Sequence, residues 1–319
     1  MIHIIAFGEM LAEFMAERID QRLDEPGSFR GPFPSGAPVI FADQAARQGA
    51  RVKYIGHLGA DAFGDAIHDR LVQAGVDVEC VKREPLPTGT AFVTYASDGS
   101  RSFVFNVSAS ASGRLGRDSI CDDVLQGCKY LHVMGSTLNN DGAIKAIDAL
   151  LTQAEAFGVK VSFDPNVRVE MLQFEPMAAA LRKVFERCHV FLPSETDLEF
   201  FYPGLPLEEA IAQCLLREQL EWVALKLGNG GCRYIDRNQS LHAKPFPVTE
   251  VDPTGAGDCF GGTFMAAIAQ GFEPQRALHL ANAAGALAVT RLGPMEGNST
   301  PDQLNAFLQE DLRNDRQIA

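Results

Sequence analysis

From residue 129 onward, short apolar runs alternate with longer helical patterns, and this alternation limits the fold more than any other feature. A strand followed by a helix and another strand favours a parallel sheet with helices on both faces. Ligands of such sheets bind beyond the carboxyl ends of the strands. The sequence therefore predicts an α/β fold. The expected strands are 130–134, 159–164, 190–193 and 222–227, and the expected helices are 141–157, 176–187, 206–219 and 257–271.

Two segments in the N-terminal third of the chain are predicted to extend away from the α/β core. Residues 13–37 are rich in glycine and proline and have little periodicity, which is typical of an excursion. Residues 88–110 contain two alternating apolar runs around Ser97-Asp-Gly-Ser100, a strong hairpin signal. We expect both segments to pair into one small sheet that covers a site as a lid. Without repeats or linkers, residues 1–319 are expected to form a single domain.

The amino-acid composition limits the kinds of partner that the protein is expected to bind. The net charge of −13 disfavours binding to nucleic acid and to anionic membranes. No stretch approaches the ~20 apolar residues of a membrane span, and the N-terminus does not resemble a signal peptide. The 7 cysteines are odd in number and widely spaced, so a disulfide framework or zinc site is not expected. The sequence predicts a cytoplasmic protein with reduced thiols.

The segment 251–264, VDPTGAGDCFGGTF, is the strongest functional signal. Gly255 and Gly257 allow backbone N–H groups to converge at the start of a helix, where the macrodipole favours an anion. Asp258 at such an anion hole is placed to accept a proton from an attacking hydroxyl. A glycine-rich turn capped by an aspartate is the alternative without function. The other common phosphate loops, G-x-x-x-x-G-K-[ST] and G-x-G-x-x-G, do not occur.

The whole run resembles the second signature of the ribokinase-like, or pfkB-type, carbohydrate kinases, and the resemblance extends along the chain. The matching segments are Gly8-Glu9, Ser35-Gly-Ala-Pro38, Gly56-His-Leu-Gly-Ala-Asp61, Phe163-Asp-Pro-Asn-Val-Arg168, Leu225-Lys-Leu-Gly-Asn-Gly-Gly231 and Asn282-Ala-Ala-Gly285. The resemblance implies a three-layer α/β/α kinase fold with a mostly parallel central sheet and a small β-sheet lid. It also implies ATP and Mg²⁺ as cofactors, and a homodimer formed through the lid.

The resemblance assigns roles to particular positions. Asp258 would be the catalytic base, with an anion hole from Gly255, Ala256 and Gly257. ATP would be bound by Ser194, Lys226, Gly228, Gly231 and Asn282. The sugar would be bound by Glu13, Gly36, Ala37, Phe92, Phe105, Arg168 and Asp258. Asp197 would act on Mg²⁺ through water, and a K⁺ site would be formed by Asp252, Thr254, Ala288, Arg291 and Gly293.

Three departures from the family pattern concern the metal and the substrate. The N-x-x-E motif appears as Ser194-Glu-Thr-Asp197. In the sugar-side motif G-G-x-x-x-N, Ser35 replaces the first glycine and Ile40 replaces the asparagine. The lid strand 103–108 lacks the aromatic–arginine pair of many fructokinases and ketodeoxygluconate kinases. Segments 31–38 and 103–108 look most like a branch labelled tagatose kinase.

Several functions remain open at this point. The leading hypothesis is transfer of the γ-phosphoryl group of ATP to a primary hydroxyl of a tagatose- or fructose-type ketohexose. Arg168 could instead hold a substrate carboxylate, as in a 2-keto-3-deoxygluconate kinase. A nucleoside kinase is less well supported. A non-catalytic sugar or nucleotide sensor is the alternative from another class. A dinucleotide-dependent oxidoreductase is disfavoured by the missing glycine fingerprint.

Overall fold

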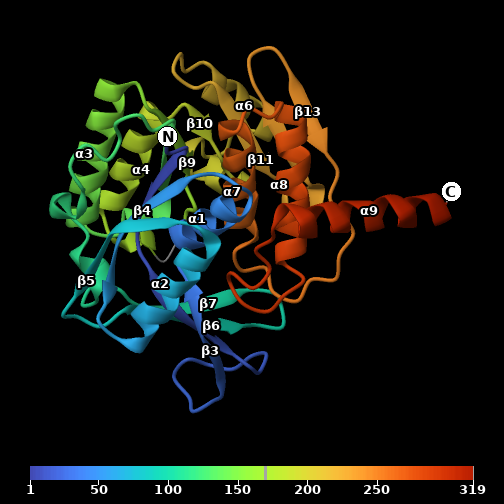
Figure 1. Cartoon of the computed structure of the whole chain (residues 1–319). Coiled ribbons are helices and arrows are strands. Elements are labelled where there is room, and N and C mark those ends of the chain that lie inside the picture. The colour runs from blue at the N-terminus through green and yellow to red at the C-terminus, as the bar shows by residue number, and fades with distance from the viewer. Residues whose placement is uncertain (169–170, 319) are drawn as a thin grey trace.

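The large sheet forms the centre of the molecule (Figure 1). The computed structural model describes residues 1–168 and 171–318. Nine strands form this sheet in the order β13-β12-β11-β10-β9-β8-β1-β4-β5. The pairings of β11 with β12 and of β12 with β13 are antiparallel, and the others are parallel. Their bounds are β1 Ile4–Phe7, β4 Val52–Gly59, β5 Asp77–Glu84, β8 Tyr130–Met134, β9 Lys160–Asp164, β10 Val190–Phe191, β11 Trp222–Lys226, β12 Cys232–Ile235 and β13 Ser240–Ala243.

Helices cover both faces of the large sheet, because its central strands are apolar on both sides. One buried cluster contains side chains of α1, α2, α7 and α8, and the other contains side chains of α3, α4, α5 and α6. The predicted three-layer α/β/α architecture is therefore confirmed. The helices are α1 Ala37–Arg47, α2 Ala62–Ala74, α3 Asp141–Phe157, α4 Pro176–Arg187, α5 Glu195–Phe201, α6 Leu207–Leu215, α7 Ala256–Ala269, α8 Pro274–Ala288 and α9 Pro301–Ile318.

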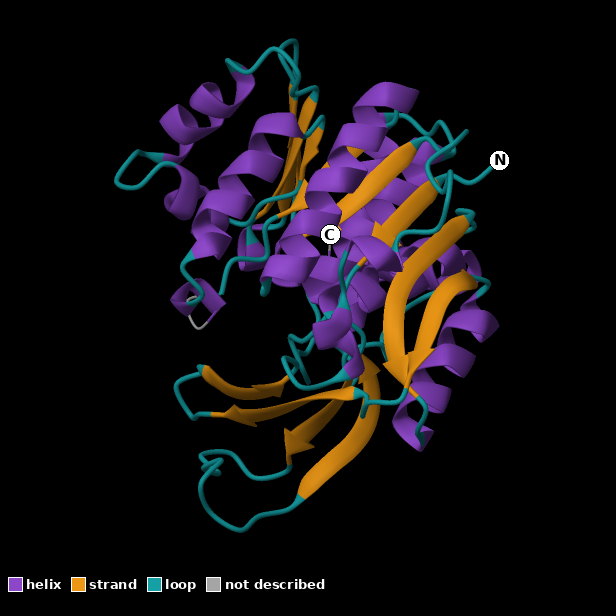
Figure 2. Cartoon of the chain, turned by 90° about the vertical axis from the view of Figure 1, so that its left-hand side faces the viewer, coloured by secondary structure: helices purple, strands orange, loops and turns teal. Residues whose placement is uncertain are grey.

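The two predicted excursions meet in a second sheet, which we call the small sheet (Figure 2). Its order is β3-β2-β6-β7, and the parallel pairing of β2 with β6 joins the two excursions. The small sheet was therefore predicted correctly. The single-domain assignment stays a prediction. The bounds are β2 Leu11–Ala16, β3 Phe29–Ser35, β6 Gly89–Tyr95 and β7 Arg101–Asn106.

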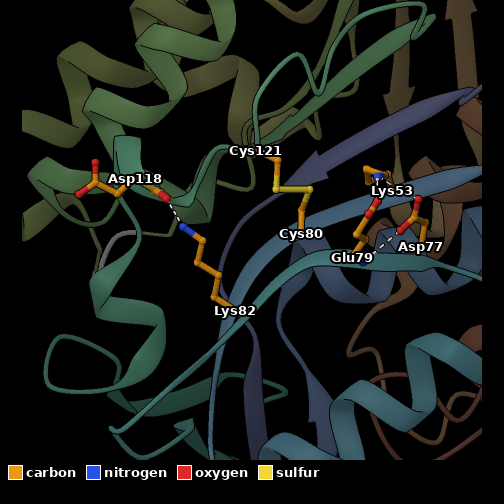
Figure 3. The surroundings of a disulfide bond; sticks show 7 residues. All are labelled: Lys53, Asp77, Glu79, Cys80, Lys82, Asp118 and Cys121. Carbon is orange, nitrogen blue, oxygen red and sulfur yellow. Dashed lines mark hydrogen bonds and ion pairs between the residues drawn. A yellow bond between two sulfur atoms is a disulfide. The ribbon is translucent and has the colours of Figure 1, made fainter.

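The prediction of reduced thiols is wrong for one pair of cysteines. Cys80 of the edge strand β5 is joined by a disulfide to Cys121, 41 residues further along the chain (Figure 3). The segment before Cys121 lies beside β5, and Lys82 Nζ donates a hydrogen bond to the carbonyl oxygen of Asp118. Wide spacing along the chain thus did not imply separation in the fold. The remaining cysteines of the described chain are buried thiols: Cys128, Cys188, Cys214, Cys232 and Cys259.

Within residues 1–168 and 171–318, no helix combines the length and the apolar character that crossing a membrane requires.

Candidate active site

The site is built around the first turn of α7. Gly255 precedes this helix with a φ of 80°, in the left-handed region that favours glycine. A Cβ atom at this position would lie 2.3 Å from the carbonyl oxygen of Pro294, so a larger residue does not fit. The first N–H groups of a helix lack partners within the helix and lie at the positive end of its dipole. The backbone of residues 255–257 therefore has a local geometry that favours an anion.

Asp258 lies in this first turn with only 6% of its surface exposed. Asn166 Nδ2 donates a hydrogen bond to Asp258 Oδ1 at 3.3 Å. Burial, reinforced by the nearby carboxylate of Asp164, raises the pKa of Asp258 from 3.8 to about 7, although Lys226 and Arg168 oppose the shift. A carboxylate with a pKa near neutrality is suited to general base chemistry.

Asp164 and Lys226 form a buried ion pair beside Asp258. They are the last residues of β9 and β11, so the parallel sheet brings them to the same edge. Lys226 Nζ lies 2.5 Å from Asp164 Oδ2. Burial raises the pKa of Asp164 to about 6, and Lys226 limits the rise. Sequence reasoning placed Lys226 in the site but missed Asp164, whose signal was its position at a strand end within Asp164-Pro-Asn-Val-Arg168.

Two pockets meet at the N-terminus of α7. The larger pocket has a volume of about 640 Å³, which is within the usual range for small-molecule sites. The predicted residues that line it are Lys226, Gly228, Gly231, Ala256, Gly257 and Asn282. Asn282 Nδ2 donates to the carbonyl oxygen of Lys244, the residue before Pro245, which also lines this pocket. Ser194 does not belong to its lining, because this residue caps α5.

The smaller pocket has a volume of about 50 Å³ and lies between α7 and the small sheet. The predicted residues that line it are Glu13, Gly36, Ala37, Phe105, Arg168, Thr254, Gly255 and Asp258. Its lining also contains residues that were not predicted as site residues: Glu9, Leu11, Ser35, Ile40, Ala91, Phe103, Val107, Ser136, Asn139 and Met171.

Two of the acidic side chains that line the smaller pocket are the buried glutamates Glu9 and Glu13. Glu9 accepts hydrogen bonds from Ser136 Oγ at 2.6 Å and Thr137 Oγ1 at 2.8 Å. Glu13 Oε2 accepts one from Ser35 Oγ at 2.5 Å, whereas no described residue donates to the buried Glu13 Oε1. Burial raises the pKa of both glutamates. Glu13 Oε1 is therefore a buried polar atom without a donor among the described residues, in a side chain that lines the pocket.

Arg168 is the cation of the smaller pocket. Its guanidinium lies 5.0 Å from the ring centroid of Phe103, and Arg168 Nε donates to Asn166 Oδ1 at 3.2 Å. Asn166 also contacts Asp258, so these three polar residues form one chain of contacts.

The placement of Phe92 differs from its prediction as a sugar contact. Its ring stacks on Phe14 at 4.9 Å and meets Phe29 edge to face, and it does not line the smaller pocket. Successive residues of a strand point to opposite faces, and in β6 the neighbouring Ala91 faces the pocket. Phe103 of β7 lies on the pocket face that was assigned to Phe92.

The carboxylate of Asp197, which was expected to act on Mg²⁺, already has protein partners. Asp197 Oδ2 accepts hydrogen bonds from the backbone N–H and the hydroxyl of Ser194, both at 2.7 Å. Asp197 Oδ1 accepts one from the N–H of Val167 at 2.8 Å. This buried residue thus closes the capping box that Ser194 begins at the start of α5, and it holds the segment before Arg168. Its role toward Mg²⁺ stays a prediction.

The residues predicted for a monovalent cation lie close together. Asp252 is 1% exposed. Its Oδ1 accepts from Thr254 N at 3.0 Å, and its Oδ2 accepts from Gly293 N at 2.9 Å. Ala288 ends α8 and its carbonyl oxygen accepts from Arg291 N at 3.4 Å. No described cluster of three or more His, Cys, Asp or Glu side chains could hold a metal ion.

Comparison with known proteins is consistent with this arrangement. The model of the pfkB family carbohydrate kinases matches residues 1–301. Probable fructokinase-4 of Arabidopsis thaliana is 30% identical over 316 residues, which cover 96% of each chain.

Solved structures resemble the whole chain. A protein from E. coli named ribokinase II, in complex with ATP and Mg²⁺, has a TM-score of 0.91 and 42% identity, and the match covers 97% of this chain and 100% of that one. A double mutant of fructokinase from Vibrio cholerae O395, in a form that contains fructose, ADP and a potassium ion, has a TM-score of 0.85 and 27% identity, with 97% and 98% covered. The chain therefore belongs to the pfkB family of carbohydrate kinases, which are phosphotransferases that act on a hydroxyl of a sugar.

Proposed function

We propose that this protein transfers the γ-phosphoryl group of ATP to a primary hydroxyl of a neutral ketohexose, of the fructose or tagatose type. The similarity to proteins named fructokinase supports the sugar class. The similarity to the ATP- and Mg²⁺-containing structure from E. coli supports the phosphoryl donor.

The observation that carries the proposal is the position of Asp258 between the two pockets. Its neighbours Ala256 and Gly257 line the larger pocket, while Asp258 itself lines the smaller one. A nucleotide in the larger pocket and a sugar in the smaller pocket would therefore meet at the N-terminus of α7. Phosphoryl transfer requires this in-line approach of donor and acceptor.

The residues of this junction supply the chemistry. Asp258 accepts the proton of the attacking hydroxyl, and its raised pKa makes this transfer favourable near neutral pH. The N–H groups of residues 255–257 stabilise the charge that develops on the transferred group. Lys226 adds a positive charge at the edge of the larger pocket. The small sheet acts as a lid that excludes water from the reacting groups.

A metal ion at this site would need ligands from the substrate and from water in addition to those from the protein. Asp197 is the carboxylate proposed for Mg²⁺, and it would act through water because protein groups already occupy its oxygens. When bound, Mg²⁺ neutralises charge on the phosphate groups. Asp252 and the backbone around Gly293 are proposed to hold K⁺ beside α7. The potassium ion in the Vibrio cholerae structure supports this proposal.

The polar groups of the smaller pocket favour a neutral sugar. Glu13 Oε1 is a buried acceptor without a described donor, so a sugar hydroxyl would satisfy it. Burial already disfavours negative charge on Glu9 and Glu13 in this pocket, and it would disfavour a substrate carboxylate there in the same way. Arg168 is the observation that supports the second candidate, a 2-keto-3-deoxygluconate kinase, because its guanidinium lines the same pocket.

The test is ADP release from Mg-ATP, with K⁺ present, across tagatose, fructose, psicose, ribose, 2-keto-3-deoxygluconate and a nucleoside. Turnover on a neutral ketohexose is expected. Turnover on the keto acid alone would establish the second candidate and make Arg168 a direct contact. Sugar-dependent thermal stabilisation without turnover on any compound would instead support a non-catalytic sensor.

The homodimer is also proposed through the small sheet. β3 and β7 are the edges of this sheet, and Val104 of β7 is 44% exposed. An exposed sheet edge tends to pair with another chain. Sedimentation equilibrium should give twice the mass of 34.6 kDa, and a monomer at micromolar concentration would contradict the dimer.

A further inference from the structure

The tip of the β6–β7 hairpin touches the segment that leads into α7. Tyr95 and Arg101 face each other across this hairpin, at the end of the strands beside the turn. This end is the part of the hairpin farthest along both strands from Gly89 and Asn106, where the hairpin joins the rest of the chain. A contact at the tip therefore adds a second anchor for the hairpin, beyond the pairing of β6 with β2.

Three hydrogen bonds make this contact, one of them between the hydroxyls of Tyr95 and Thr254 at 3.4 Å, and we call them the latch. The phenol of Tyr95 donates to Asp252 Oδ1 at 3.1 Å. Arg101 Nη1 donates to Thr254 Oγ1 at 3.4 Å. Both acceptors are buried, with Asp252 at 1% and Thr254 at 8% exposure. A buried hydrogen bond to an ionised carboxylate is stronger than one between neutral groups, so the Tyr95–Asp252 bond is the main part of the latch.

Asp252 links the latch to the start of α7. The oxygen that accepts from Tyr95 also accepts from the N–H of Thr254, the residue before Gly255. Its other oxygen accepts from the N–H of Gly293. Pro294, the next residue, has its carbonyl oxygen so close to Gly255 that no Cβ fits there. One carboxylate therefore holds the hairpin tip and both segments that shape the turn before α7.

The hairpin also forms a wall of the smaller pocket. Ala91 of β6, together with Phe103 and Phe105 of β7, lines this pocket between the base of the hairpin and its tip. Movement of the hairpin away from α7 would open the pocket and break the latch at the same time. The pocket wall and the anion-binding turn are thus joined through Tyr95.

We propose that Tyr95 is a positioning residue. Its bond to Asp252 couples closure of the small sheet over the sugar to ordering of the anion-binding turn, so that the two occur together. This inference rests on the proposed function for its kinetic consequence, because it assumes that a sugar occupies the smaller pocket.

The variant Tyr95→Phe tests the proposal, since it removes the donor and keeps the ring. Tyr234→Phe is the matched control, because Tyr234 donates to Asp236 Oδ2 at 2.8 Å on β12 and lines neither pocket. In Tyr95→Phe, kcat/KM for the sugar should fall about tenfold or more, as for loss of a hydrogen bond to a charged group. The KM for ATP should change little, and the share of ATP hydrolysed without sugar phosphorylation should rise. Tyr234→Phe should match the wild type in all three quantities.

A second measurement does not depend on turnover. Hydrogen–deuterium exchange of residues 89–106 should be faster in Tyr95→Phe than in the wild type and in Tyr234→Phe. Unchanged exchange would overturn the latch, and faster exchange with unchanged sugar kinetics in an active enzyme would overturn the coupling. Failure of the wild type on every sugar would refute the proposed function, while the exchange result would still decide whether the latch holds the hairpin.

Discussion

The variant Asp258→Asn is expected to be more stable than the wild type at pH 8. The folded protein holds the proton of Asp258 up to about pH 7, whereas the unfolded chain releases it near the ordinary value of 3.8. Burial of this carboxylate therefore lowers stability progressively as the pH rises between these values. Each pH unit of this interval costs about 1.4 kcal/mol, so the full cost above pH 7 is about 4 kcal/mol. Asparagine has a similar shape and no charge.

Thermal unfolding measures this difference. With about 2.1 cal/mol/K of unfolding entropy per residue, 4 kcal/mol corresponds to a rise in Tm of about 6 °C for 319 residues. At pH 5 the difference should shrink to about 2 kcal/mol, because only part of the interval has been crossed. Asp69→Asn is the control, since the Asp69 side chain is 70% exposed, and it should leave Tm unchanged. A variant no more stable than the wild type at pH 8, or a gain that does not depend on pH, would refute the reasoning.

Two further predictions concern pH and the disulfide. A pH–rate profile should show kcat/KM for the sugar falling about tenfold per pH unit below pH 7, because Asp258 must be deprotonated to act, and a flat profile down to pH 5 would contradict its role. Replacing Cys80 by serine opens a loop of 41 residues and should lower the free energy of unfolding by about 3 to 4 kcal/mol in urea titrations. Cys232→Ser, at a buried thiol, serves as the comparison, and equal losses in both variants would argue against a contribution from the disulfide.

The regular parts of the fold could be predicted because their periodicity is local. The alternation after residue 129 predicted β8, β9 and β11 almost to the residue. β5 was missed because this edge strand, Asp77–Glu84, is largely polar. The β12–β13 hairpin was missed because its turn, residues 236–239, lacks the glycine that marked the turn of β6 and β7.

The residues of the site also differ in whether a local sequence pattern could predict them. Residues within one motif, such as Gly255 to Asp258, could be predicted together because the motif carries its own geometry. Phe92 does not line the smaller pocket, and the sequence alone could not indicate this, because assigning a strand residue to a face requires its partner strands, which only the fold supplies. Three other contacts join residues that are far apart in the sequence, so no local pattern could predict them. They are the disulfide, the Asp164–Lys226 pair and the Tyr95–Asp252 bond, with separations of 41, 62 and 157 positions.

The most direct test of the account compares steady-state ADP release by the wild type and Asp258→Asn on the best sugar of the panel. We expect turnover by the wild type and a loss of about 10²- to 10⁴-fold in kcat for the variant, the usual contribution of a general base. ATP binding, followed by calorimetry, should be preserved. A variant that keeps wild-type turnover would contradict the assignment of Asp258 as the base and with it the central claim.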